Sequence, residues 1–190
     1  HISRNPSIQL QLLSDLIAVT ETLAAAHLEQ PAWLKDSVRL MAPMLRSLRL
    51  GDGGLGLFNG GAMEDADVID QILSKSGVRA RTQSSAPHSG FHRLSAGRSA
   101  VIMDTGNMPG RDANRWGHAG ALSFEMSAGK ERLIVNCGAY AGTRDDWKLA
   151  QRTTAAHSTI GIADLSSSEI LPRPMIGARP GNVVVRRNES

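Results

Sequence analysis

ALSFEMSAGKERLIVNCG, residues 121–138, is the stretch that decides the fold. Two segments of strand length, rich in apolar residues, flank the short turn SAGKE at 127–131, which contains a glycine. Apolar segments of this length joined by a short glycine-containing turn are typical of a β-hairpin. The sequence therefore predicts two antiparallel strands, one over 121–128 and the other over 132–138.

Four more segments have the same strand-like character. They are FHRLSA at 91–96, RSAVIMD at 98–104, HSTIGIA at 157–163 and NVVVR at 182–186. The turn SAGR, which joins the first two, predicts a second hairpin. We therefore expect an antiparallel β-region in the second half of the chain.

The first third of the chain has helical periodicity instead. Asn5 and Pro6 form a helix start signal, because asparagine caps a helix and proline is tolerated at its first position. Apolar residues follow at helical spacing up to Leu23. Further helices are expected over 34–48 and 64–76, each followed by a glycine that stops it.

Helices followed by antiparallel strands predict an α+β fold, with a helical segment at 1–82 and a β-domain at 83–190. No run of apolar residues approaches the roughly 18 that a membrane span requires. The chain has one cysteine, so an intrachain disulfide and a cysteine-rich zinc site are both excluded. This composition leaves the cellular compartment and the oligomeric state open.

The charge balance is mildly basic, with a net charge of +3 and a pI near 9.5. Such an excess suits a polyanionic partner, either an acidic polysaccharide or nucleic acid, and it equally suits a plain solvated surface. The chain has only three Phe, three Trp and one Tyr. Because binding of single-stranded nucleic acid uses aromatic stacking platforms, this composition argues against a nucleic-acid partner.

GDGGLG at 51–56 matches the glycine pattern of a dinucleotide site. Such a site requires a buried strand before the glycines and a carboxylate about 20 residues after them. Here a helical segment precedes the motif, and Ser74, Lys75 and Ser76 occupy the region where the acid is expected. The glycines are therefore expected to form a tight exit from the second helix.

The histidines are more informative than the glycines. His88 and His92 flank the start of the β-region, where either could face a cleft. His118 and His157 lie on neighbouring predicted strands, and with an oxygen ligand such as Asn136 between them they could hold a metal ion. The alternative is that each imidazole is satisfied by a nearby hydrogen-bond partner.

Two stretches together resemble the heparinase II/III-like family of polysaccharide lyases. They are GHAGALSFEMSAGKERLIVNCGAY at 117–140 and RTTAAHSTIGIAD at 152–164. Members typically have a histidine-rich stretch ending in L-S-F-E, a hairpin into a V-D-P-G-like strand end, and then A-H-N-T-V. The N-terminal HISRNPSIQ is similar to the family's H-x-E-R-S-P-x-Y-H, which lies in a late helix of an α/α toroid.

The resemblance implies that residues 1–82 are the end of an α/α toroid whose larger part lies outside this chain. Residues 83–190 would then begin a β-sandwich and be incomplete. Family members cleave uronate-containing acidic polysaccharides by β-elimination, in which a base removes the proton α to the carboxyl group. An active lyase would be periplasmic or secreted, although a cytoplasmic location stays open.

The resemblance also implies that the chemistry is altered. The family's catalytic tyrosine and the histidine that follows it fall on Ile8 and Gln9, and the first histidine of its H-x-H stretch falls on Trp116. Tyr140 and His118 remain as catalytic candidates.

Matching the other motifs gives the remaining candidates. His118, Asn136 and His157 correspond to a metal constellation, with zinc either weakly bound or absent because Asn136 replaces an aspartate. The expected substrate-binding residues are Arg4, Arg152, His88 and His92. Arg4 and Arg152 have an alternative role as structural anchors.

Three functions therefore compete. The first is a polysaccharide lyase-like protein with an atypical or lost active site, whose partner is an acidic polysaccharide and neither nucleic acid nor a membrane. The second is a non-catalytic carbohydrate-binding or structural module on the same scaffold, which Ile8, Gln9 and Trp116 favour. The third is a nucleic-acid binder, which lacks supporting aromatic residues.

Overall fold

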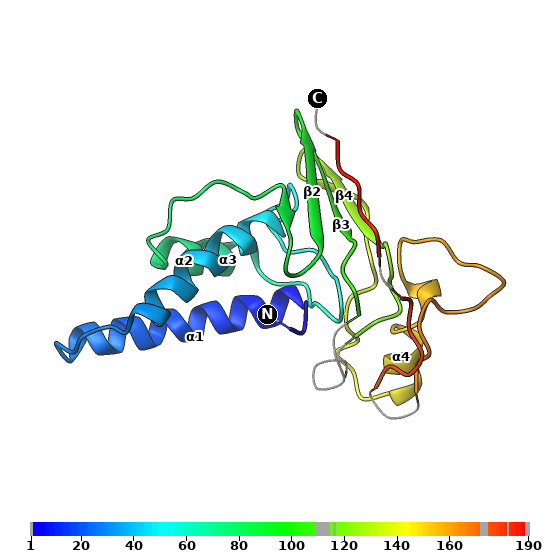
Figure 1. Ribbon diagram of the computed structural model, residues 1–190, viewed down its shortest axis with the longest axis horizontal. Coiled ribbons are helices and arrows are strands. Elements are labelled where there is room, and N and C mark those ends of the chain that lie inside the picture. Colours follow the sequence, from blue (N-terminus) through cyan, green and yellow to red (C-terminus); the bar gives the residue numbers. More distant parts are fainter. Residues whose placement is uncertain (1, 109–114, 116, 172–174, 182, 189–190) are drawn as a thin grey trace.

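The computed structural model describes residues 2–108, 115, 117–171, 175–181 and 183–188. Three helices lie on one side of a twisted sheet, and the segment that carries the short helix α4, Asp145–Ala150, lies on the other side (Figure 1). The α+β prediction is confirmed. The described residues contain one of the two sheets that a β-sandwich requires.

The first three helices follow the signals in the sequence. Helix α1 spans Pro6–Ala25, and its cap is the side chain of Asn5, which accepts hydrogen bonds from the amides of Ser7 and Ile8. Helix α2 spans Ala32–Ser47 and helix α3 spans Ala66–Lys75. These boundaries confirm the three predicted helices. The sequence could predict them because caps and stop residues act locally.

The strands form one antiparallel sheet in the order β1-β2-β3-β4-β5. Their bounds are β1 Ser85–Ala86, β2 Phe91–Ala96, β3 Ser99–Asp104, β4 Phe124–Ala128 and β5 Glu131–Ile134. Both predicted hairpins are confirmed, since β2 pairs with β3 and β4 pairs with β5. A register shift interrupts the second hairpin between Met126 and Ser127.

Helix α4, Asp145–Ala150, was not predicted, and Asp145 and Asp146 form its first turn, where carboxylates are favourable. Two predicted strands were wrong. The segment 157–163 is not a strand, because side-chain hydroxyls of Ser158 and Thr159 bond to the backbones of two different neighbours instead of forming a ladder. The described part of 182–186 forms no strand either.

The hydrophobic core joins the helices to the sheet. Buried residues of the three helices pack in one cluster with Phe58, Ala86, Phe91 and Ile102. At the same junction the buried guanidinium of Arg4 forms an ion pair with the carboxylate of Asp104 at the end of β3. Helices and strands share this core. The division into two domains at residue 82 therefore stays a prediction.

The glycines of 51–56 form the expected tight exit from helix α2. Leu50 and Gly54 close the turn by backbone hydrogen bonding, and the amide of Gly51 donates to the hydroxyl of Ser127 on β4. The turn therefore connects the helices to the sheet. Among the helices of the described residues, none has the length and apolarity needed to cross a membrane.

Candidate functional site

A pocket of about 380 Å³ lies where α4, the stretch after β5 and the stretch before β4 meet. We call it the Tyr140 pocket, and its lining residues are Gly60, Arg115, His118, Ala139, Tyr140, Lys148, Gln151 and Arg152. Three of these side chains are cationic and none is a carboxylate. The pocket is therefore suited to an anionic ligand.

Helix α4 and the residues after it place the polar wall of this pocket. Lys148 and Gln151 are three positions apart, so they lie on the same side of the helix. Arg152 follows directly, and its Nε donates to the carbonyl of Gly117 at 3.0 Å. Tyr140 stacks on Trp147 with ring centroids 6.3 Å apart, which fixes the tyrosine against the helix.

The two candidate histidines of the metal constellation meet at the edge of this pocket. Nδ1 of His118 lies 3.1 Å from Nε2 of His157, and the rings are perpendicular. Nδ1 of His157 lies 2.7 Å from the carbonyl oxygen of Thr153, to which it donates. Neutral rings satisfy this geometry when the Nδ1–H of His118 donates to Nε2 of His157.

Both imidazoles are neutral at physiological pH. Burial lowers the pKa of His118 to about 3, and electrostatic interactions with His157 and Arg152 lower it further. A hydrogen bond to the Gln151 backbone acts in the opposite direction. Burial also lowers the pKa of His157, and the bond to Thr153 opposes it. A base of such low pKa accepts protons poorly in general base catalysis.

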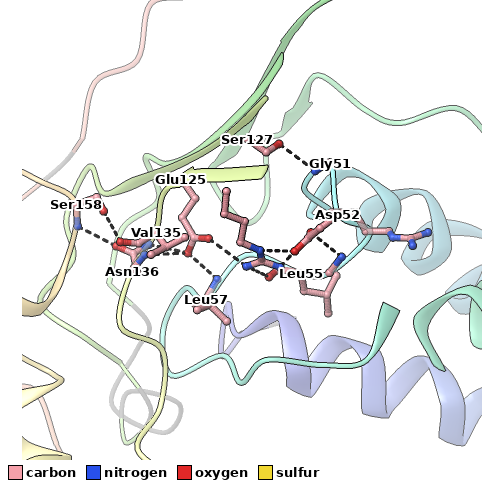
Figure 2. A network of polar contacts seen from close by, with 12 residues as sticks. Gly51, Asp52, Leu55, Leu57, Glu125, Ser127, Val135, Asn136 and Ser158 are labelled. Carbon is pink, nitrogen blue, oxygen red and sulfur yellow. Dashed lines mark hydrogen bonds and ion pairs between the residues drawn. The ribbon is translucent and has the colours of Figure 1, made fainter. Parts of the chain in front are cut away.

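Asn136 does not join the two imidazoles through its amide contacts. Its Nδ2 donates to Oε1 of Glu125 at 3.0 Å, and its Oδ1 accepts from the amide of Ser158, also at 3.0 Å. Figure 2 shows Asn136 between Glu125 on β4 and Ser158, the residue that follows His157. These two partners fix the orientation of the amide, because Glu125 accepts and the Ser158 amide donates.

Glu125 is the centre of this network and is fully buried. Its Oε1 also accepts from the amide of Leu57 at 2.6 Å. Its Oε2 has no hydrogen-bond partner among the described residues and lies 3.8 Å from a guanidinium nitrogen of Arg132. Burial raises the pKa of Glu125, against the hydrogen bonds of Leu57 and Asn136 and the charge of Arg132. Arg132 in turn pairs with Asp52 at 2.6 Å.

Arg4 does not line the Tyr140 pocket. Besides its ion pair with Asp104, its guanidinium donates to the backbone carbonyls of Ser89, Gly106 and Asn107. It borders a cavity of about 20 Å³, which has room for about one water molecule. This geometry favours the structural alternative for Arg4 over substrate binding.

The other substrate-binding candidates are divided in the same way. Arg152 lines the Tyr140 pocket, whereas His88 is exposed in the turn between β1 and β2 and His92 pairs with Met103 in the sheet. Neither His88 nor His92 lines that pocket. Gln9 is buried and bonds to the carbonyl of Met41, and Trp116 lies outside the described residues.

Arg115, Lys148 and Gln151 are pocket residues that the sequence did not indicate. The aspartate pair at 145–146 is a signal that could have found two of them, because acids are typical of the first turn of a helix. In such a helix Lys148 and Gln151, three positions apart, lie on the same side. Arg115 had no such signal, because only the fold brings it to the pocket.

Residues 78–190, more than half of the chain, match the family model described as "Heparinase II/III-like, C-terminal". The chain belongs to this family. In the crystal structure of heparinase III, the matching region has a TM-score of 0.72 and 13% identity, covering 87% of this chain and 32% of that one. The heparan sulfate lyase HepC from Pedobacter heparinus gives 0.68 and 14%, covering 88% and 30%. At these identities the likeness shows the shared fold.

A curated relative is more similar in sequence to this heparinase II/III-like chain. FtsZ-localized protein C of Caulobacter vibrioides (strain NA1000 / CB15N) is 31% identical over 182 residues, which cover 94% of this chain and 30% of the relative. The chain thus spans less than a third of the length of that relative.

The residues present fit the zinc ion implied by the resemblance poorly. Two nitrogens bound to one tetrahedral zinc are about 3.3 Å apart, close to the spacing of His118 and His157. The third position, Asn136, brings no negative charge, and both ends of its amide are engaged. Within the described residues, no three His, Cys, Asp or Glu side chains cluster as metal ligands.

Proposed function

We propose that this heparinase II/III-like chain binds an acidic polysaccharide in the Tyr140 pocket and that its lyase active site is degenerate. The observation that carries the proposal is the lining of this pocket, where Arg115, Lys148 and Arg152 lie beside Tyr140 and none of the described lining residues is a carboxylate. Arginine and lysine donate to carboxylate or sulfate groups, and a tyrosine ring offers an apolar face to a sugar.

Binding without β-elimination agrees best with the protonation states in the pocket. Elimination needs a base of suitable pKa beside the reacting carbon, and burial keeps His118 a weak base. The family's catalytic tyrosine and histidine are replaced by Ile8 and Gln9, neither of which transfers protons. Among the described lining residues, Tyr140 and Lys148 also carry groups that could donate or accept a proton.

The name of the curated relative supports a second candidate, a structural module that takes part in localising a longer protein. That name records localization with FtsZ and no reaction. Co-localization of the full-length protein with FtsZ, followed by fluorescence in dividing cells, tests this candidate. A uniform distribution would remove it.

Calorimetric titration with an oligosaccharide of uronates tests the binding proposal. Lys148→Ala should weaken binding by roughly five-fold, which is about 1 kcal/mol, and should flatten its salt dependence. Arg144→Ala is the matched control, because Arg144 occupies the N-cap position of the same helix and does not line the pocket. Equal affinities for the two variants, or equal binding of a neutral oligosaccharide, would sink the proposal.

The elimination reaction is tested separately by ultraviolet absorbance of the unsaturated product with heparin and alginate. We expect no product from the wild-type protein. A signal that disappears in Tyr140→Phe would instead assign β-elimination to this pocket.

A further inference from the structure

We propose that hydrogen bonds, and not a metal ion, hold the segment 152–158 against the ends of β4 and β5. The contacts are the His118–His157 pair and the chain that runs from Glu125 through Asn136 to Ser158. We call these five residues the clasp. The inference goes beyond ligand binding, because it concerns what replaces the ion in this part of the scaffold.

The first argument is the amide of Asn136. It is almost completely buried, and a buried amide must satisfy both its donor and its acceptor. Nδ2 of Asn136 donates to the carboxylate of Glu125, and its Oδ1 accepts from the amide of Ser158. The side chain therefore connects β4 to the residue that follows His157, which is the connection that a bridging cation would otherwise provide.

The second argument is the charge around the imidazoles. His118 lines the same pocket as Arg115, Lys148 and Arg152, whose positive charges oppose a dication. The carboxylate of Glu125 is paired with Arg132. A metal here would have to be bound by two neutral rings and an amide oxygen, which is a poor donor set for zinc.

The third argument is that the segment has other direct ties to the same two strand ends. The amide of Phe124 donates to the carbonyl of Ser158 at 3.2 Å, and the hydroxyl of Ser158 donates to the carbonyl of Val135 at 2.6 Å. The carbonyl of Ser158 thus contacts β4, and its amide and hydroxyl contact Asn136 and Val135, the residues that directly follow β5. The hydrogen-bonding groups of this residue are satisfied without an ion.

Hydrogen exchange at the amide of Ser158 tests the clasp directly, since that N–H donates to Asn136. Glu125→Met removes the group that orients Asn136, and we expect exchange at Ser158 to become at least ten-fold faster. Ser127→Ala is the matched control, because Ser127 is a buried neighbour on β4 whose hydroxyl accepts from Gly51 instead. The control should speed exchange at Gly51 and leave Ser158 unchanged.

Either of two results in this experiment overturns the proposal. One is unchanged protection of Ser158 in Glu125→Met, and the other is an equal loss of protection in both variants. In the first case Glu125 does not set the Asn136 contact. In the second case exchange at Ser158 reports the general stability of β4.

Zinc titration of the wild-type protein gives a second test that does not depend on the folding of a variant. The protein is first treated with a chelator and dialysed, and zinc chloride is then added in a calorimeter. We expect no saturable binding at one equivalent and an unchanged Tm after chelation. Stoichiometric binding that His157→Ala abolishes would overturn the proposal.

Discussion

Nδ1 of His118 and Nε2 of His157 lie 3.1 Å apart although 39 positions separate them in the chain. Their contact brings the stretch before β4 together with the turn that precedes Ser158. His118 is buried and His157 is partly buried, and both rings are neutral. The stability of the folded chain therefore depends on pH through the protons that the unfolded chain would bind.

Stability should rise as the pH increases from about 3 to 6.5, because the folded His118 has a pKa of about 3 and the unfolded value is 6.5. In this window the unfolded state binds more protons, so acidification favours unfolding by up to about 1.4 kcal/mol per pH unit. Denaturant unfolding of wild type and His118→Gln at several pH values measures the difference. The raised pKa of Glu125 acts with the opposite sign above 4.5 and cancels in the comparison. Parallel pH profiles of the two proteins would contradict the assignment.

Gly120→Ala should disrupt the histidine contact. An added Cβ would lie 2.8 Å from Cδ2 of His157, so the ring must move. Overpacking of this kind costs about 1–3 kcal/mol, or a fall in Tm of roughly 2–4 °C for each kcal/mol. Gly161→Ala is the control, since a Cβ there has no neighbour within 4 Å. If the two variants melt together, the close approach at Gly120 is incorrect.

Arg4→Ala should lower the free energy of unfolding by about 3–5 kcal/mol, because it leaves the carboxylate of Asp104 buried without its cation. Arg39→Ala breaks an exposed ion pair with Asp36 and should cost at most about 0.5 kcal/mol. Chemical denaturation of both variants measures these costs. A stable Arg4→Ala protein would return Arg4 to the list of ligand-binding candidates.

Asn136→Asp should destabilise the protein at neutral pH by about 1–3 kcal/mol. The new carboxylate oxygen would stand where Nδ2 now donates to Glu125, so a hydrogen bond becomes a contact between two acids. Glu125→Gln in the same chain should recover much of the loss. Asn188→Asp, an exposed change of the same charge, is the control. Thermal melts of the four proteins decide whether the amide has the orientation described.

Local signals predicted most of the fold. The cap at Asn5 and the glycine turns at 97 and 129 work through backbone geometry alone, so the helices and both hairpins followed from them. Helix α4 was missed because six residues are too few for periodicity. The strand predicted over 157–163 was wrong because tertiary hydrogen bonds overrode the β-propensity of that segment.

The site was less predictable than the fold. Pattern matching indicated that His118 and His157 belong together, and their contact is found. The partners of Asn136 depend on how β4 and β5 are aligned, and the register shift after Met126 cannot be derived from side-chain alternation. The tertiary fold brings Lys148, Arg115 and Tyr140 into one pocket from separate segments of the chain. Their spacing in the sequence does not predict this.

The ion pair of Arg4 with Asp104 has a consequence for how this part of the scaffold can be inherited. Asn59 also donates to Asp104, so three distant segments meet in one buried polar junction. A chain cut near residue 80 would leave an unneutralised carboxylate and an open apolar face on the strand side. Recombination that exchanged the helices for those of a different scaffold would meet the same obstacle. We therefore expect helices and sheet to pass from gene to gene as one piece.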